Sequence, residues 1–355
     1  MRALAFPLRL TLCGLALLGA LLSPAHAAGV LRVLAWPGYV DSETVRAFER
    51  AQGVKVVLTV IDSDEALWQR MQLRGDQAID VLALNTAELQ RYVAANQVQP
   101  VEPGRIANLA RVQPQFRELA GIPGLVHSTP RGERPFAIPY AYTAMGLIYD
   151  RAQFSEAPTS VAALWDARWR GKVLVYDGGT HNFSLAAQSL DMVSPFQIPE
   201  QDTQRVATRL IELRRNILSV YGKPEESVRL FVRHKAALMF ANYGMQQLHL
   251  LREAGINVGY VLPREGALAW LDCWAISRQA SNVELAHAWI NHMLGESASQ
   301  NLSQRQGLSN TVDAPAIPLP REKVLWLRPV EDAAQRERLW TRIRSGDRLA
   351  KVMTP

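Results

Sequence analysis

Strand and helix patterns alternate along the first third of the chain, and this order constrains the fold more than any other feature. Three runs rich in apolar and β-branched residues predict strands at 30–35, 54–61 and 81–84. Polar caps at Asp41 or Ser42, at 62–64 and at Thr86 predict the helices that follow these strands. The resulting βαβαβα order favours a mostly parallel sheet with helices on both faces.

The remainder of the chain predicts a second set of alternating elements. The apolar stretch 136–149 has no helical period and is interpreted as extended chain that passes from one lobe to another. The later predicted strands are 172–176, 236–241, 258–262 and 268–276, and the later helices begin at His181 or span 203–216, 283–294 and 333–343. A chain of 355 residues suggests about two domains. We therefore expect an α/β protein with two lobes, one of 28–141 plus about 272–318 and one of 142–271 plus about 319–355.

The N-terminus has the layout of a cleaved secretory signal. Arg2 and Arg9 supply positive charge, residues 10–22 are almost entirely apolar, and 25–27 (Ala-His-Ala) offers small residues at the cleavage site. A membrane-spanning helix needs about 20 residues, and the apolar run is shorter. An N-terminal membrane anchor that is never cleaved is therefore the less favoured alternative. The bulky Leu12 before Cys13 disfavours lipid anchoring. We expect residues 1–27 to be removed and the protein to be soluble in the periplasm.

Charge and cysteine content exclude other classes of protein. The net charge is +6, and the basic residues are scattered instead of forming a stripe, so we expect no nucleic-acid partner. Without Cys13, Cys273 stands alone and no intrachain disulfide can form. Because Cys273 lies in an apolar run, we interpret it as a buried small hydrophobic residue and not as a nucleophile.

The sequence lacks the motifs of common enzymes and metal sites. It contains no Gly-x-Ser-x-Gly, no His-Glu-x-x-His, no phosphate-binding Gly-x-x-x-x-Gly-Lys and no dinucleotide glycine fingerprint. His287 and His292 are five apart, which misses the spacing of helical metal ligands. We therefore expect a protein that is not an enzyme and that uses no cofactor or metal.

Aromatic and acidic residues gather at the ends of predicted strands, where open α/β sheets place their ligands. These residues are Trp36 and Tyr39 after the first strand, Asn85 after the third, Asp177 after a strand of the second lobe, and Trp270 with Asp272 near a return crossing. Aromatic faces attract an organic cation and a carboxylate supplies the opposite charge. This combination favours a site for a protonated amine.

In these residues and in further segments the chain resembles the solute-binding proteins of bacterial ABC importers, in particular the spermidine/putrescine-binding branch. The resemblance covers nearly all of the chain after the signal, and the segments that carry it are 34–40, 79–82 before Asn85, 138–140, 143–146, 164–165, 169–172, 270–272 and 275–276. It implies a periplasmic binding protein fold whose two α/β lobes close over a ligand, with aromatic walls and acidic residues that hold amines.

Carried over by position, Trp36 and Tyr39 match an aromatic wall of the first lobe and Asn85 a small polar contact. Trp270 matches a stacking tryptophan, and Asp272 matches the carboxylate that pairs with an amine nitrogen. Asp177 is retained among the acids of the second lobe.

The chain departs from the family where a second amine would be held. Gly178 and His181 stand where further acids are expected, Ala241 replaces an aromatic residue for which Tyr243 is a substitute, and no tyrosine lies near Leu308. The turn 178–180 leads into a helix N-terminus, which favours an anion. The ligand is therefore either a polyamine with altered contacts or an ω-amino acid or other mono-amine zwitterion, and the sequence leaves both open.

The resemblance implies capture of a small amine and its delivery to an ABC permease in the inner membrane, by a protein expected to be monomeric. Two alternatives remain at this point. One is an exported enzyme on a binding-protein scaffold, which would need a catalytic pair that the motifs do not supply. The other is a receptor module that presents its ligand to a membrane sensor.

Overall fold

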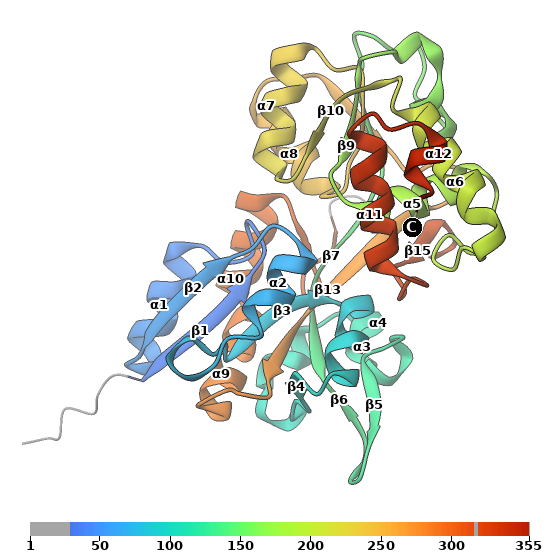
Figure 1. The fold of residues 1–355 in the computed structure, drawn as a ribbon. Coiled ribbons are helices and arrows are strands. Elements are labelled where there is room, and N and C mark those ends of the chain that lie inside the picture. Colours follow the sequence, from blue (N-terminus) through green and yellow to red (C-terminus); the bar gives the residue numbers. More distant parts are fainter. Residues whose placement is uncertain (1–28, 316–318, 355) are drawn as a thin grey trace, which may run out of the picture.

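The computed structural model describes residues 29–315 and 319–354. The described strands form two large sheets, one in each of two lobes, and a separate hairpin (Figure 1). This arrangement confirms the predicted two-lobed α/β fold. The signal segment 1–27 lies outside the described residues.

The larger sheet begins with three parallel strands, as the alternating order predicts. Its strand order is β14-β7-β13-β3-β1-β2, and β4 and β15 also pair with β13. The strands of this sheet are β1 (Val30–Ala35), β2 (Lys55–Val60), β3 (Val81–Asn85), β4 (Val98–Gln99), β7 (Ala137–Ala144), β13 (Ala267–Ser277), β14 (Ser309–Asn310) and β15 (Val324–Trp326). Because β13 runs antiparallel to β3, β4 and β7, the sheet is mixed and not mostly parallel.

Three helices of the first lobe begin at the polar caps that the sequence predicts, one of them with a shift. The helices here are α1 (Ser42–Gln52), α2 (Asp64–Arg70), α3 (Thr86–Ala94), α4 (Pro114–Arg117), α9 (Val283–Met293) and α10 (Glu296–Gln300). Asp41 caps α1, which ends at Gly53 in the left-handed conformation. The cap of α3 is Asn85 and not Thr86, because the Asn85 side chain accepts hydrogen bonds from the backbone N–H groups of Ala87 and Glu88.

The second sheet has the order β10-β9-β11-β8-β12. Its strands are β8 (Leu147–Asp150), β9 (Val173–Tyr176), β10 (Ile217–Tyr221), β11 (Leu238–Phe240) and β12 (Val258–Val261), and the helices of this lobe are α5 (Gly179–Ser189), α6 (Glu200–Leu213), α7 (Pro224–His234), α8 (Met245–Glu253), α11 (Ala333–Arg344) and α12 (Leu349–Val352). β9, β10 and β11 are parallel, whereas β8 is antiparallel to β11 and β12.

The sequence analysis did not predict β10, α7 or α8. In α7 and α8, polar and charged residues separate the apolar ones, so the pattern is weaker than in the central strands.

Two long strands connect the lobes. β7 and β13 pair over most of their length, and in Figure 1 they run from the first lobe toward the second. All residues of both strands are buried, which explains why their sequences are apolar without alternation. β15 pairs with the first residues of β13, and the chain then enters α11 in the second lobe. The precise lobe boundaries given above stay a prediction.

The remaining elements are short. The hairpin β5 (Val126–Thr129) and β6 (Gly132–Pro135) projects from the first lobe (Figure 1). In residues 29–315 and 319–354, no helix combines the length and apolar character needed to cross a bilayer. Cys273 has no exposed surface, and burial raises the pKa of its thiol, in agreement with a core residue.

Candidate functional site

A cavity of about 40 Å³ lies between the lobes, at the ends of β1, β3 and β9 and beside β13. It is lined by Trp36, Pro37, Tyr39, Asp64, Asn85, Tyr176, His181, Asn242, Tyr243, Trp270, Asp272 and Leu327. The structure thus brings together Trp36, Tyr39, Asn85, His181, Tyr243, Trp270 and Asp272, which the sequence predicts as ligand residues. Both lobes contribute, because Tyr176 ends β9 and His181 lies in α5 after it, whereas Trp36 and Tyr39 follow β1.

The centre of the cavity wall is a hydrogen bond between Tyr39 and Asp272. The Tyr39 hydroxyl donates to Oδ2 of Asp272 at 2.6 Å, and both residues are 5% exposed. Burial raises the pKa of the Asp272 carboxyl to about 7, and the hydrogen bond from Tyr39 opposes that rise. Burial and the neighbouring Asp272 raise the pKa of Tyr39, so its hydroxyl remains a donor.

The turn that positions Tyr39 requires glycine. Gly38 has a φ of +82°, and a Cβ there would lie 2.5 Å from the side-chain nitrogen of Gln246 and 2.9 Å from the side-chain oxygen of Gln306. The Tyr39 N–H closes the turn on the Trp36 carbonyl at 3.2 Å. The strand end and this tight turn therefore fix Trp36 and Tyr39 side by side.

Hydrogen bonds also fix the two indole rings. Trp36 donates from Nε1 to the Ala83 carbonyl at 3.0 Å, within the first lobe. Trp270 donates from Nε1 to the Asn242 carbonyl at 3.0 Å and so joins β13 to the loop after β11. The Tyr39 and Trp270 ring centroids are 6.3 Å apart, which places two aromatic faces against the same cavity.

The residues from the second lobe are uncharged at neutral pH. Nδ1 of His181 shares a 2.8 Å hydrogen bond with Oδ1 of Asn242, and burial lowers the pKa of His181 to about 4. The Tyr243 hydroxyl donates to the Gly222 carbonyl at 2.6 Å. Burial raises the pKa of both Tyr176 and Tyr243, so neither phenol ionises near neutral pH.

Asp177, which the sequence also predicts as a ligand residue, is not among the residues that line the cavity. Its carboxylate accepts a 2.9 Å hydrogen bond from Nε1 of Trp340 and pairs with Arg344. Both partners belong to α11, a helix far away in sequence that packs on α5. Asp177 therefore fastens the end of β9 to α11.

The anion site suggested at the start of α5 is already used by the chain itself. The Gly179 N–H donates to Oε2 of Glu337 at 2.7 Å. This carboxylate from α11 occupies the helix N-terminus to which the carboxylate of an ω-amino acid would bind. The Gly179 N–H is therefore not available to the carboxylate of a zwitterionic ligand.

The sequence analysis missed Asp64, Tyr176 and Asn242. Asp64 was interpreted as part of a helix cap, yet its side chain lines the cavity. A signal was present, because Asp64 follows β2, which lies parallel to β1 and ends at the same edge of the sheet. Asn242 follows β11 in the same way, although this strand belongs to the other lobe.

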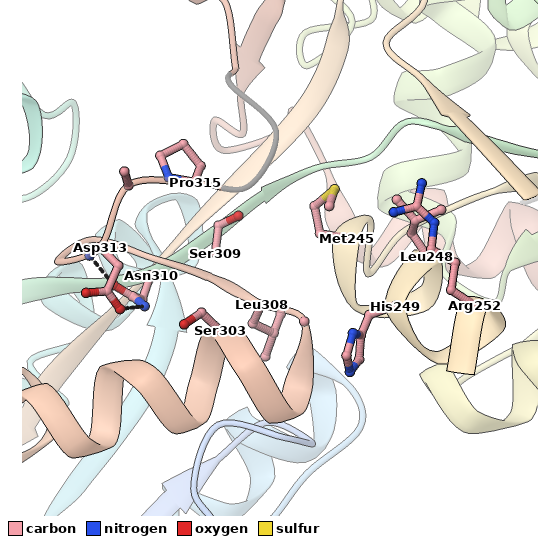
Figure 2. Close-up of a pocket in the computed structure, with 12 residues that line it drawn as sticks. Met245, Leu248, His249, Arg252, Ser303, Leu308, Ser309, Asn310, Asp313 and Pro315 are labelled. Atoms are coloured by element: carbon pink, nitrogen blue, oxygen red, sulfur yellow. Dashed lines mark hydrogen bonds between the residues drawn. The ribbon is translucent and has the colours of Figure 1, made fainter. Parts of the chain in front are cut away.

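A second hollow of about 170 Å³ lies between α8 and the segment around β14. In Figure 2, Met245, His249 and Arg252 face Ser303 and Asp313 across this space. Asp313 is engaged with Asn310, whose side-chain nitrogen donates to it at 2.9 Å. The aromatic walls and buried carboxylates of the first cavity are not among the residues that line this hollow, so the first cavity is the better amine site.

Comparisons with known proteins agree with this architecture. Residues 43–316 match the model of a family described as bacterial extracellular solute-binding protein. The spermidine/putrescine-binding periplasmic protein 1 of Haemophilus influenzae is 23% identical over 300 residues, which is 84% of this chain and 79% of that protein. The putrescine-binding periplasmic protein PotF of Escherichia coli is 23% identical over 347 residues, with 89% and 91% covered.

Solved structures show the same fold. A putative spermidine/putrescine ABC transporter protein from Listeria monocytogenes superposes with a TM-score of 0.75 at 19% identity, covering 92% of this chain and 99% of that one. The Tp0655 (TpPotD) lipoprotein of Treponema pallidum superposes with a TM-score of 0.74 at 16% identity, covering 89% and 99%. With two lobes, a cavity between them and a family match over most of its length, the chain belongs to the bacterial extracellular solute-binding protein family.

Proposed function

We propose that this protein captures a small polyamine, such as putrescine or spermidine, in the periplasm and delivers it to an ABC permease. The observation that carries the proposal is the buried carboxylate of Asp272, held by the Tyr39 hydroxyl at 2.6 Å in a cavity with aromatic walls. The names of the relatives in Haemophilus influenzae and Escherichia coli support a polyamine.

The electrostatics of the cavity favour an ammonium group. Burial destabilises the charge of Asp272, as its raised pKa of about 7 indicates. Burial removes the carboxylate from water, and a protonated amine beside it supplies the compensating positive charge. The faces of Trp36, Tyr39 and Trp270 add attraction for a cation through their ring quadrupoles.

The size of the cavity couples binding to movement of the lobes. A volume of about 40 Å³ holds only a few water molecules, at roughly 10–15 Å³ each. A diamine therefore enters when the lobes separate, and the present arrangement corresponds to a closed form. In this form Trp270 of the connecting strand β13 donates to the Asn242 carbonyl after β11. Two lobes joined by connecting strands support a hinge mechanism of capture.

Calorimetric titration with putrescine, spermidine, 4-aminobutyrate and 5-aminovalerate tests the proposal. We expect the two polyamines to bind and the two amino acids to bind weakly or not at all. Tight binding of an amino acid without a response to either polyamine would overturn the proposal. Mass spectrometry of the ligand after long incubation with the protein distinguishes binding from enzymatic turnover. An unchanged ligand mass indicates binding alone.

A further inference from the structure

Asp64 provides a second acidic position in the cleft. We propose that Asp64 holds the second ammonium group of an α,ω-diamine whose first ammonium group pairs with Asp272, an inference that rests on the proposed amine-binding function. Asp64 begins α2 and lines the cavity that also contains Asp272. Its Oδ1 atom has no exposed surface and no hydrogen-bond partner among the described residues. A buried carboxylate oxygen without a partner is unfavourable unless a ligand supplies one.

The space beside Asp64 accommodates a longer ligand. A larger cavity of about 410 Å³ adjoins the first one and shares Asp64, Asn85, His181 and Leu327 with it. Asp64 thus stands where the two cavities meet, and Asp272 stands in the smaller one. An alkyl chain that starts at Asp272 can therefore extend past the aromatic walls to Asp64.

Neighbouring charges do not neutralise Asp64. Arg91 is the nearby cation, but it pairs with Glu88 at 3.5 Å and lies over the Trp68 ring, 3.9 Å from its centroid. Burial, then the charges of Glu88 and Asp272, raise the pKa of Asp64 well above its usual range, and Arg91 opposes this rise. An ammonium group at this position would offset the effects of burial and of both neighbouring carboxylates.

Of the other acids that line the larger cavity, Glu88 has no hydrogen bond at Oε2 but pairs with Arg91 at 3.5 Å, and Glu331 and Asp332 accept hydrogen bonds. Oε2 of Glu331 accepts from Nη2 of Arg336 at 2.6 Å. Asp332 accepts from the Gln335 N–H at 2.7 Å and caps α11. Among the described residues that line the two cavities, Asp64 therefore combines an enclosed oxygen with a position next to Asp272.

Both ammonium positions lie on the first lobe and on β13, whereas the second lobe contributes the uncharged groups Tyr176, His181, Asn242 and Tyr243 to the smaller cavity. This division has a consequence for capture. The open first lobe recognises both charges of the diamine, and the second lobe then covers the alkyl chain. Asp64 thus takes the place of the further acids that the family resemblance leads us to expect after β9.

The experiment compares putrescine with 1-aminobutane, which has the same chain length and one ammonium group. In the native protein, putrescine should bind at least 10-fold more tightly than 1-aminobutane. Asp64→Asn should remove this difference by weakening putrescine at least 10-fold, with 1-aminobutane unchanged. Asp272→Asn should weaken both ligands. Glu65→Gln, which removes an exposed acid from the neighbouring position of α2, is the matched control and should bind both ligands as the native protein does.

The outcomes separate the two proposals. If the native protein binds neither amine, the proposed function fails. If it binds putrescine and 1-aminobutane equally, or if folded Asp64→Asn retains native putrescine affinity, the assignment of Asp64 fails while amine binding stands. The comparison of the two ligands on the native protein needs no variant, so equal binding would overturn the assignment even if Asp64→Asn does not fold.

Discussion

The hydroxyl of Tyr39 donates a 2.6 Å hydrogen bond to Oδ2 of Asp272, and these residues lie 233 positions apart in the sequence. The bond joins the turn after β1 to the centre of β13, where Asp272 is paired with Asn85 of β3. It therefore fixes Oδ2 of Asp272 and leaves the other carboxylate oxygen for a ligand. The same contact moderates the pKa of Asp272, which burial raises to about 7.

Tyr39→Phe should weaken amine binding while the fold is retained. The change removes a hydrogen bond to a charged group, which contributes about 1.5–3 kcal/mol in proteins. It also removes the contact that opposes the raised pKa of Asp272, so more of the carboxyl is protonated at pH 7. Calorimetric titration of putrescine should show a dissociation constant about 10-fold or more higher. Native affinity in this variant would mean that the hydroxyl does not orient the carboxylate.

The contribution of Asp272 to the stability of the free protein should fall as the pH rises through 7. The folded-state pKa of Asp272 is about 7, above the value of 3.8 expected in an unfolded chain. The folded state therefore binds the proton more tightly, so this stabilisation is complete below pH 4 and is lost as the pH passes 7. Between pH 6 and pH 8 the loss is about 1 kcal/mol.

Urea unfolding at these two pH values, in the native protein and in Asp272→Asn, measures this contribution. The stability difference between the two proteins should change by that amount, because the other titrating groups are common to both. A difference that does not depend on pH would contradict the raised pKa. His181 has the opposite effect in this range, because burial lowers its pKa from 6.5 to about 4 and only the unfolded chain releases a proton there. This contribution is the same in both proteins and cancels in the difference between them.

Asp177→Asn should lower stability and leave amine affinity within about two-fold of native. Asp177 binds Trp340 and Arg344 of α11 and is not part of the cavity wall. Weakening these contacts should reduce the free energy of unfolding by about 1 kcal/mol. Urea unfolding and calorimetric titration on the same preparation measure the two effects. A large loss of affinity at native stability would return Asp177 to the ligand site.

Trp270→Phe should weaken binding more than it weakens the fold. The change removes the Nε1 hydrogen bond to the Asn242 carbonyl, which joins β13 to the loop after β11, and reduces the aromatic face of the cavity. We expect about 5-fold to 10-fold weaker putrescine binding, which corresponds to roughly 1 kcal/mol.

Trp274→Phe is the matched control, because Trp274 is fully buried and its Nε1 has no hydrogen-bond partner within the part of the chain that the structure describes. It should lower stability and leave affinity unchanged. The reverse result, with affinity lost in Trp274→Phe and kept in Trp270→Phe, would move the binding wall away from the cavity described.

Local patterns predicted the central elements well. β1 has the predicted bounds, and α1 is capped by Asp41, one of the two residues predicted for this cap. These features depend on side chains close in sequence, so a short segment contains the necessary information. The shift of the α3 cap from Thr86 to Asn85 is of the same local kind, because both residues can cap and the structure shows which side chain turns back to the helix.

Residues at strand ends identified most of the candidate site from the sequence, but not all of it. Trp36, Tyr39, Asn85, Trp270 and Asp272 were found in this way and line one cavity. Asp64 follows β2 at the same edge of the sheet, but it was interpreted as part of a helix cap and not as a residue that lines the cavity. Asp177 also follows a strand, yet a helix more than 150 residues away captures its carboxylate.

The sequence alone determined the two sets of alternating elements, the apolar crossing strands and the residue types that suit a cation, because periodicity and side-chain chemistry are local properties. Only the tertiary structure decided which acids remain free for a ligand. Trp340 and Arg344 engage Asp177, Glu337 fills the start of α5, and Oδ1 of Asp64 stays enclosed without a partner among the described residues. These outcomes depend on how distant helices pack, and packing brings together groups that no local pattern connects.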